Sequence, residues 1–183
     1  MVDKRGLHGL SCQKSAGRLP RHAHINDIVK RALATAGIPA ILEPVGLDRG
    51  DGKRPDGISV FPFSEGKSLC WDATVSDTFC QTALLSSAHS PGSAANRAED
   101  RKIAHYQSLQ SQYRFTPISM ETTGAYGKLT EKFVSELGRR LRGATGDPRE
   151  ASWLRQRLSL AIVRGNAISI TGTGQFKFHR SNH

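Results

Sequence analysis

The segment 51–77 most constrains the fold, because it contains two apolar runs separated by one short turn. The runs are Gly57–Phe61 and Ser68–Val75, and the sequence SEGK that separates them is typical of a β-turn. Runs of this length with a glycine-containing turn between them pair as antiparallel strands. The segment is therefore predicted to form a β-hairpin, and the rest of the chain has to pack around it.

Asp72 is the unusual residue of this hairpin, because it lies inside the most apolar stretch of the chain. Strand alternation predicts that it shares one face with Cys70 and Thr74. The opposite face would carry Leu69, Trp71 and Ala73. A buried carboxylate without a partner is costly, so a metal ion, a cation or hydrogen-bond donors are expected beside it. Asp56 precedes the first run, and two carboxylates on adjacent strands can hold a divalent cation.

Length and apolar content predict one intracellular domain. The chain has 183 residues, of which 37% are hydrophobic, and its mean hydropathy is −0.43. No apolar run approaches the roughly 20 residues that span a bilayer, and residues 1–10 lack the apolar core of a signal peptide. The three cysteines are too few and too scattered to indicate a disulfide framework.

The charge balance indicates nucleic acid as the partner. The chain carries 26 lysines and arginines against 16 acidic residues, a formal net charge of +10. Arginine fits phosphate with its planar guanidinium, and such a basic chain attracts a polyanion. The alternative is ordinary solubility charge, or an arginine-rich genome composition. No glycine-rich phosphate-binding loop and no GxSxG motif is present, so the sequence does not indicate an NTPase, a dinucleotide-binding protein or an α/β-hydrolase.

The predicted elements alternate between helices and strands, which indicates an α/β sandwich with a small mixed β-sheet flanked by helices. Helices are predicted over 27–36, 94–112 and 129–142, with a further one from Pro148. Strands are predicted over 38–43, the hairpin, 113–124 and a short final segment, 167–171. Residues 76–91 are expected to be irregular. The domain is predicted to span 25–172, between a basic N-terminal arm (1–24) and a disordered tail (173–183).

Several other residues are candidates for a functional site. Glu43 ends a predicted strand, where it is either a solvated charge or a third acid beside Asp56 and Asp72. The predicted helix 94–112 carries Arg101, Lys102 and Tyr106, which suit contact with a phosphate or with the acidic centre. The alternative for this helix is a solvated amphipathic face with Tyr106 as a half-buried anchor. The sequence leaves both pairs of alternatives open.

The N-terminal arm contains candidate zinc ligands. His8 and Cys12 are four residues apart, and His22 and His24 follow. A structural zinc site needs four ligands, and no CxxC motif supplies the remaining ones. The arm is therefore either half of a zinc site or a loose basic segment.

The acidic residues occur in an order that resembles a known nuclease family. In sequence order, the acids and the residues that accompany them are Glu43, Arg54-Pro55-Asp56, Asp72-Ala73-Thr74, and then Lys102 and Tyr106. This order resembles the PD-(D/E)XK restriction-endonuclease-like nucleases. It is similar in more detail to the restriction-like endonuclease domain of non-LTR retrotransposon polyproteins. The similarity extends from about His8 to Ile170, and implies a restriction-endonuclease-like sandwich with extra C-terminal helices.

The resemblance implies a metal-dependent DNA endonuclease that nicks a target site in the nucleus. Asp56, Asp72 and the carbonyl of Ala73 would hold Mg²⁺ or Mn²⁺, with Glu43 bound directly or through water. The family's lysine follows the second acid by two residues, where this chain has Thr74. Lys102 is then the candidate for that catalytic charge, with Arg101 as second choice. The residues expected to contact DNA are Lys53, Arg54, Arg101, Tyr106, Arg139, Arg140 and Arg155.

The same resemblance extends upstream of the nuclease. In the family a Cys-Cys-His-Cys zinc knuckle precedes the nuclease, and residues 6–12, with His8 and Cys12, are similar to its second half. Residues 21–26 are similar to the start of the following helix. The first two cysteines are missing, which predicts a fragment or a gene model that begins inside the element. Zn²⁺ is thus a second candidate cofactor with an incomplete site.

Two alternatives from other functional classes remain. One is a catalytically inactive DNA- or RNA-binding remnant of such an element, which Thr74 and the incomplete knuckle favour. The expected partner is DNA in either case, with the element's RNA as an alternative. The other is an interaction module whose acids have no catalytic role, and it predicts that Asp72 pairs with an arginine instead of facing a cleft. Oligomeric state is left undetermined.

Overall fold

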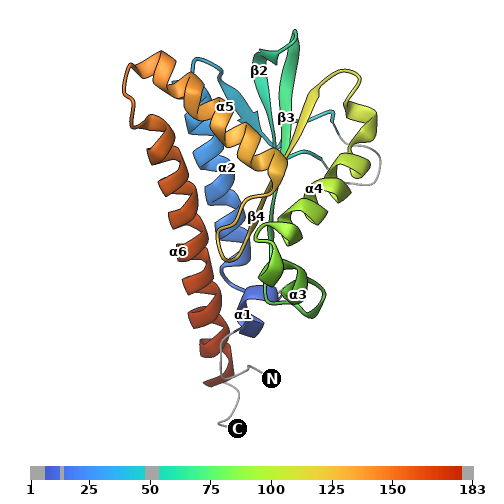
Figure 1. Cartoon of the computed structure of the whole chain (residues 1–183), viewed down its shortest axis with the longest axis vertical. Coiled ribbons are helices and arrows are strands. Elements are labelled where there is room, and N and C mark those ends of the chain that lie inside the picture. The colour runs from blue at the N-terminus through green and yellow to red at the C-terminus, as the bar shows by residue number, and fades with distance from the viewer. Residues whose placement is uncertain (1–6, 13–14, 48–53, 179–183) are drawn as a thin grey trace.

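The chain folds as an α/β protein with one mixed sheet and flanking helices (Figure 1). The computed structural model describes residues 7–12, 15–47 and 54–178. The strands are β1 (Ala40–Leu42), β2 (Gly57–Ser64), β3 (Lys67–Ser76) and β4 (Arg114–Glu121). The helices are α1 (Leu7–Ser11), α2 (Arg18–Thr35), α3 (Gln81–His89), α4 (Ser93–His105), the 3₁₀ turn η1 (Gln107–Leu109), α5 (Lys128–Thr145) and α6 (Glu150–Phe178).

The open sheet has the order β1-β2-β3-β4, and the predicted hairpin forms its centre. β1, β2 and β3 are antiparallel, with Ile58 opposite Cys70 across the hairpin. β4 runs parallel to β3, with Ala73 opposite Ile118. A parallel pair needs a long crossover connection, and α3 and α4 provide it. The predicted α/β class, the mixed sheet and the hairpin are therefore confirmed.

The two faces of β3 pack against different layers, as its alternating pattern predicts. Trp71 and its neighbours on that face join the main core, in which Ile25 of α2, Phe133 of α5 and Leu158 of α6 are also buried. Cys70 on the other face packs with Tyr106, the residue that follows α4. The sheet is thus covered by α2, α5 and α6 on one side and by α4 on the other, and Asp72 belongs to the α4 side.

Helix α2 begins at Arg18, well before the start at Asp27 that the capping pattern predicts and closer to the start within 21–26 that the resemblance implies, so much of the predicted arm is helical. Pro20 does not prevent this, because a proline in the first turn of a helix interrupts no required hydrogen bond. Close packing on α6 stabilises the added turns. A Cβ on Gly165 would lie 2.5 Å from the Cβ of Arg21, so only glycine permits this approach.

Other boundaries also differ from the predictions. Residues 76–91 contain α3, whose Ser87 donates to the buried Glu121. Helix α4 ends at His105 instead of Gln112, and the Gln110 side chain donates to the carbonyl of Ile103 nearby. The predicted final strand 167–171 is wrong, because α6 continues as one helix of 29 residues to Phe178. Part of the predicted tail is therefore helical, and residues 179–183 lie outside the described part of the chain.

Two buried glutamates link the helices on the α4 side. Glu121 of β4 accepts the backbone N–H of Ala94 in the first turn of α4, at 2.9 Å. Glu99 of α4 accepts the backbone N–H groups of Leu129 and Thr130 in the first turn of α5, at 2.9 and 2.8 Å. A carboxylate at a helix N-terminus satisfies N–H groups that lack intrahelical partners. These acids fix α4 between β4 and α5.

None of the described helices combines the length and apolar character that a membrane span requires.

Candidate functional site

Asp72 has the partners that a buried carboxylate requires. Its side chain is 7% exposed, and the Nζ of Lys102 lies 2.8 Å from its Oδ1. The Tyr106 hydroxyl donates to its Oδ2 at 2.7 Å. The same hydroxyl lies 3.1 Å from the carbonyl oxygen of Arg54. The interaction-module alternative predicted an arginine as the partner, and this is wrong: the partners are a lysine and a tyrosine from the end of α4.

Asp56 lies where the pairing of β2 with β3 ends. Its backbone N–H donates to the carbonyl of Trp71 at 2.9 Å, and its Oδ2 accepts the N–H of Ala73 at 2.6 Å. The Nε2 of His22 lies 2.9 Å from the same oxygen. The Asp56 side chain thus continues the ladder beyond the end of β2. Because the N–H and C=O of a strand residue face the same neighbour, the carbonyl of Ala73 also faces Asp56.

The ionisation of these groups follows from their neighbours. Burial raises the pKa of Asp56, but hydrogen bonds from His22 and Ala73 outweigh it, and the net pKa is lowered from 3.8. The hydrogen bond to Asp56 raises the pKa of His22 above 6.5, against the effect of burial. Burial and the charge of Asp72 raise the pKa of Cys70 to about 12, and they raise that of Tyr106 well above 10. Asp56 is therefore a carboxylate, and both Cys70 and Tyr106 keep their protons.

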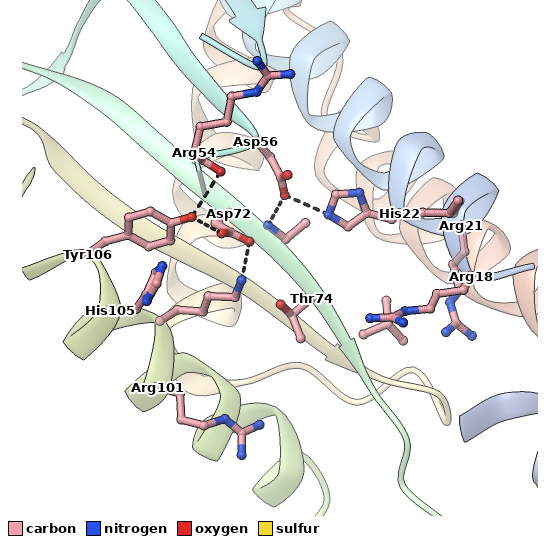
Figure 2. Close-up of a pocket in the computed structure, with 14 residues that line it drawn as sticks. Arg18, Arg21, His22, Arg54, Asp56, Asp72, Thr74, Arg101, His105 and Tyr106 are labelled. Atoms are coloured by element: carbon pink, nitrogen blue, oxygen red, sulfur yellow. Dashed lines mark hydrogen bonds and ion pairs between the residues drawn. The ribbon is translucent and has the colours of Figure 1, made fainter. Parts of the chain in front are cut away.

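Asp56 and Asp72 line one cleft of about 750 Å³ between α2 and α4 (Figure 2). Basic side chains surround the two acids. Arg18, Arg21 and His22 come from α2, Arg54 from the segment before β2, and Arg101, Lys102 and His105 from α4. Thr74 lies between the acids and the arginines of α2. The cleft thus combines an acidic centre with a basic rim.

Glu43 does not join the two aspartates. Its backbone N–H donates to the carbonyl of Asp56 at 2.8 Å, so the main chain is close to the site. However, Glu43 has a φ of +50°, in the left-handed region, and its side chain is 69% exposed in an ion pair with Arg54. It does not line the cleft. Of the two alternatives for Glu43, the structure shows the solvated charge and not a third converging acid, because this turn directs the side chain toward solvent.

The predicted nucleic-acid contacts separate into two groups. Arg54 and Arg101 line the cleft, as does Tyr106, although its ring is buried and its hydroxyl holds Asp72. The other group does not line it. Arg140 pairs with Glu136 and stacks on Phe63, Arg155 pairs with Glu131, and Arg139 is exposed on α5. Lys53 lies outside the described residues.

Sequence reasoning missed three residues of the cleft on α2. Arg18, Arg21 and His22 were assigned to a basic arm, where His22 was a candidate zinc ligand. Their spacing of three and four residues is the signal that could have found them, because it places all three on one side of a helix. That signal is lost when the helix is started at Asp27.

No zinc site is apparent in the part of the chain that the structure describes. His8 and Cys12 lie one turn apart at α1, where the backbone N–H of Cys12 donates to the carbonyl of His8 at 3.0 Å. Among the described residues, no three histidine, cysteine or acidic side chains gather closely enough to hold a metal ion. Any metal at the acidic centre would therefore have two carboxylates as its protein side-chain ligands.

This donor set fits one class of cation. Two carboxylates and a backbone carbonyl are hard oxygen donors, and Mg²⁺ is usually held by one or two carboxylates with water and substrate phosphates completing its shell. Neither His22 nor Cys70 changes this assignment, because His22 is engaged with Asp56, and Cys70 is fully buried against Tyr106 and keeps its proton. Comparison with known proteins gives no further guidance, because neither a family model nor a curated protein matches the chain.

Proposed function

We propose that this chain is a Mg²⁺- or Mn²⁺-dependent DNA endonuclease domain of the PD-(D/E)XK type, derived from a non-LTR retrotransposon. One observation carries the proposal: Asp56, Asp72 and Lys102, which the sequence pattern selected together, line the same cleft. Lys102 contacts Asp72 directly, at 2.8 Å. This contact supports the role of Lys102 as the charge that Thr74 does not provide.

Each group would have a defined role in phosphodiester hydrolysis. Asp56 and Asp72 would hold the cation with the carbonyl of Ala73. The cation, when bound, would acidify a water molecule and neutralise charge on the scissile phosphate. Lys102 would stabilise the negative charge that develops on that phosphate, since a preorganised cation in a cleft acts strongly there. Tyr106 would orient Asp72 through its hydroxyl.

Nicking of supercoiled plasmid in Mg²⁺ or Mn²⁺ tests the proposal. Asp72→Asn keeps the shape of the side chain and removes its charge. Loss of a residue that only supports a metal ligand lowers activity by up to about a hundredfold, so loss of the ligand itself should lower the nicking rate by at least about that factor. Asp27→Asn is the matched control, because Asp27 is an exposed partner of Arg31 on α2. Full nicking by Asp72→Asn would refute the assignment of the metal site.

A second candidate is a DNA- or RNA-binding domain with the same cleft and no hydrolytic activity. It is favoured by the outward position of Glu43, which leaves the centre with two acids. It predicts salt-sensitive DNA binding by the wild-type chain with no nicking in either metal. Asp72→Asn would then bind DNA more tightly, because the substitution removes a negative charge from the cleft.

A further inference from the structure

One end of the cleft contains basic residues that the proposed chemistry does not use. Arg18 and Arg21 of α2 line this end, and Figure 2 shows them together on the far side of Thr74 from Asp72. Burial lowers the pKa of Arg21, the charge of Asp77 opposes this, and the charge of Arg18 lowers the pKa further, so the two arginines interact. Two guanidinium groups in one wall of a cleft are a favourable place for an anion.

Arg21 is buried and incompletely satisfied. The residue is 5% exposed, and its Nη1 donates to the Oδ1 of Asn166 at 2.5 Å. Its Nε is buried without any hydrogen-bond partner. A buried donor that lacks an acceptor is costly, so a native structure usually provides one or leaves it for a ligand. The unpaired Nε lies on the Nε–Nη2 edge, which is an edge that arginine uses for bidentate contacts with phosphate.

Contacts from α6 hold this guanidinium in place. Asn166 donates through its Nδ2 to the carbonyl of Thr122 at 2.7 Å, so its oxygen is directed to Arg21. Gly165 leaves room for the aliphatic stem, because a Cβ there would lie 2.5–2.6 Å from three carbons of Arg21. Glycine inside a helix costs about 1 kcal/mol relative to alanine. The helix therefore carries a destabilising residue at the position where Arg21 requires it.

We propose that Arg18 and Arg21 form a phosphate-binding subsite, which holds a second phosphodiester of the nucleic acid whose neighbouring phosphate reaches Asp56 and Asp72. Arg21 provides a fixed charged contact from the wall of the cleft, and the exposed Arg18 closes over the phosphate from solvent. This inference rests on the proposed function only in assigning the phosphate to a nucleic acid. It gives the cleft a direction, because the strand must run from the acidic centre past Thr74 to α2.

Binding without added metal tests the subsite independently of catalysis. The probe is a fluorescein-labelled DNA duplex, titrated by anisotropy at several salt concentrations. Arg18→Gln and Arg21→Gln should each weaken binding about tenfold, the size expected for a charged hydrogen bond. Each should also reduce the slope of log K against log salt by about one, as loss of one phosphate contact requires. Arg157→Gln, an exposed arginine of α6, is the matched control and should change neither quantity.

A second probe keeps the test valid if Arg21→Gln does not fold. Duplexes with one neutral methylphosphonate at successive positions should reveal a position that weakens wild-type binding, and that loss should disappear in Arg18→Gln. The subsite would be overturned if the folded variants kept the wild-type affinity and salt slope. It would also be overturned if the methylphosphonate weakened DNA binding by Arg18→Gln as much as it weakens binding by the wild type. Plasmid nicking is scored separately. If the wild type nicks plasmid but the arginine variants bind DNA as tightly as it does, the nuclease proposal stands and the subsite is rejected. If the wild type does not nick but the variants bind DNA more weakly, the subsite stands and the nuclease proposal is rejected.

Discussion

Glu99 and Glu121 are as deeply buried as Asp72, yet different kinds of group compensate their charges. Both glutamates accept backbone N–H groups at the start of a helix, and hydroxyl groups complete their shells. Asp72 and Asp56 are instead paired with the side chains of Lys102 and His22, and all four residues line the cleft. The first pair is fixed by the fold, and the second is held largely by side chains that can move.

This difference separates structural acids from candidate functional acids. A backbone donor can leave a glutamate only if the helix end unfolds, so Glu99 and Glu121 cannot exchange partners in the native state. A lysine or histidine can turn to solvent or to a phosphate when a cation takes its place. We infer that burial of an acid indicates a functional role here only when the compensating charge is on a side chain in the cleft.

The largest effect is expected on the nicking rate, when Lys102 beside the candidate functional acid Asp72 is replaced. Lys102→Met should slow plasmid nicking about a hundredfold, because it removes a preorganised charge from the reacting phosphate. DNA affinity should change much less, since many other basic groups contribute to it. Lys132→Met on the exposed face of α5 is the control and should nick at the wild-type rate. Equal rates for both variants would separate Lys102 from catalysis.

Replacing the structural acid Glu99 should lower the stability of the fold. Glu99→Gln replaces one carboxylate oxygen by an NH2 group, which cannot accept, so at least one of the helix N–H groups loses its partner. It should lower the free energy of unfolding by about 2 kcal/mol, which corresponds to a fall in Tm of about 4–8 °C. Glu131→Gln is the matched control, because it weakens an exposed ion pair with Arg155 and should cost less than about 1 kcal/mol. Urea unfolding measures both.

Replacing the carboxylate of Asp72 by an amide should affect stability much less than the same change at Glu99. Asp72→Asn removes the cost of burying a carboxylate, and the Lys102 side chain, which is 29% exposed, can turn to solvent instead of remaining a buried unpaired charge. Stability should therefore stay within about 1 kcal/mol of the wild type. Chemical unfolding in a chelator measures it. A loss at Asp72→Asn as large as that at Glu99→Gln would break the comparison, because it would make Asp72 a structural acid.

The smallest expected effect is a pH dependence from His22. The folded pKa of Asp56 lies below 3.8, so its contribution is present above that value and is lost as pH falls through the folded pKa. The folded pKa of His22 lies above 6.5, so its contribution is complete below 6.5 and is lost as pH rises through the folded pKa. Together they predict that the pair stabilises the fold most between pH 3.8 and 6.5.

Comparing His22→Gln with the wild type measures this effect. The difference in unfolding free energy should be larger at about pH 5 than at about pH 8. It should stay below about 1 kcal/mol, because the His22 side chain is 39% exposed and water screens the pair. His24→Gln, an exposed histidine of the same helix, is the control. A difference that does not change with pH would mean that His22 acts only by packing.

Part of the site followed from local patterns alone. The alternation of β3 predicted that Asp72 and Cys70 share a face, while Lys102 came from the family resemblance. Asp72 stood out because a carboxylate in an apolar strand needs a partner wherever it folds. These predictions succeeded because the period of a strand or helix fixes which side chains share a face, and this property is already present in a short segment.

Other features depended on contacts between distant segments. Where α2 begins, and hence the presence of His22 and Arg21 in the cleft, depends on packing against Gly165 of α6. Whether α6 ends before residue 167 or continues depends on the same packing. The outward direction of Glu43 follows from one left-handed residue in a turn. Sequence thus determined which face each side chain takes, while tertiary structure decided which faces meet, because long-range packing energy outweighs local propensity at the ends of elements.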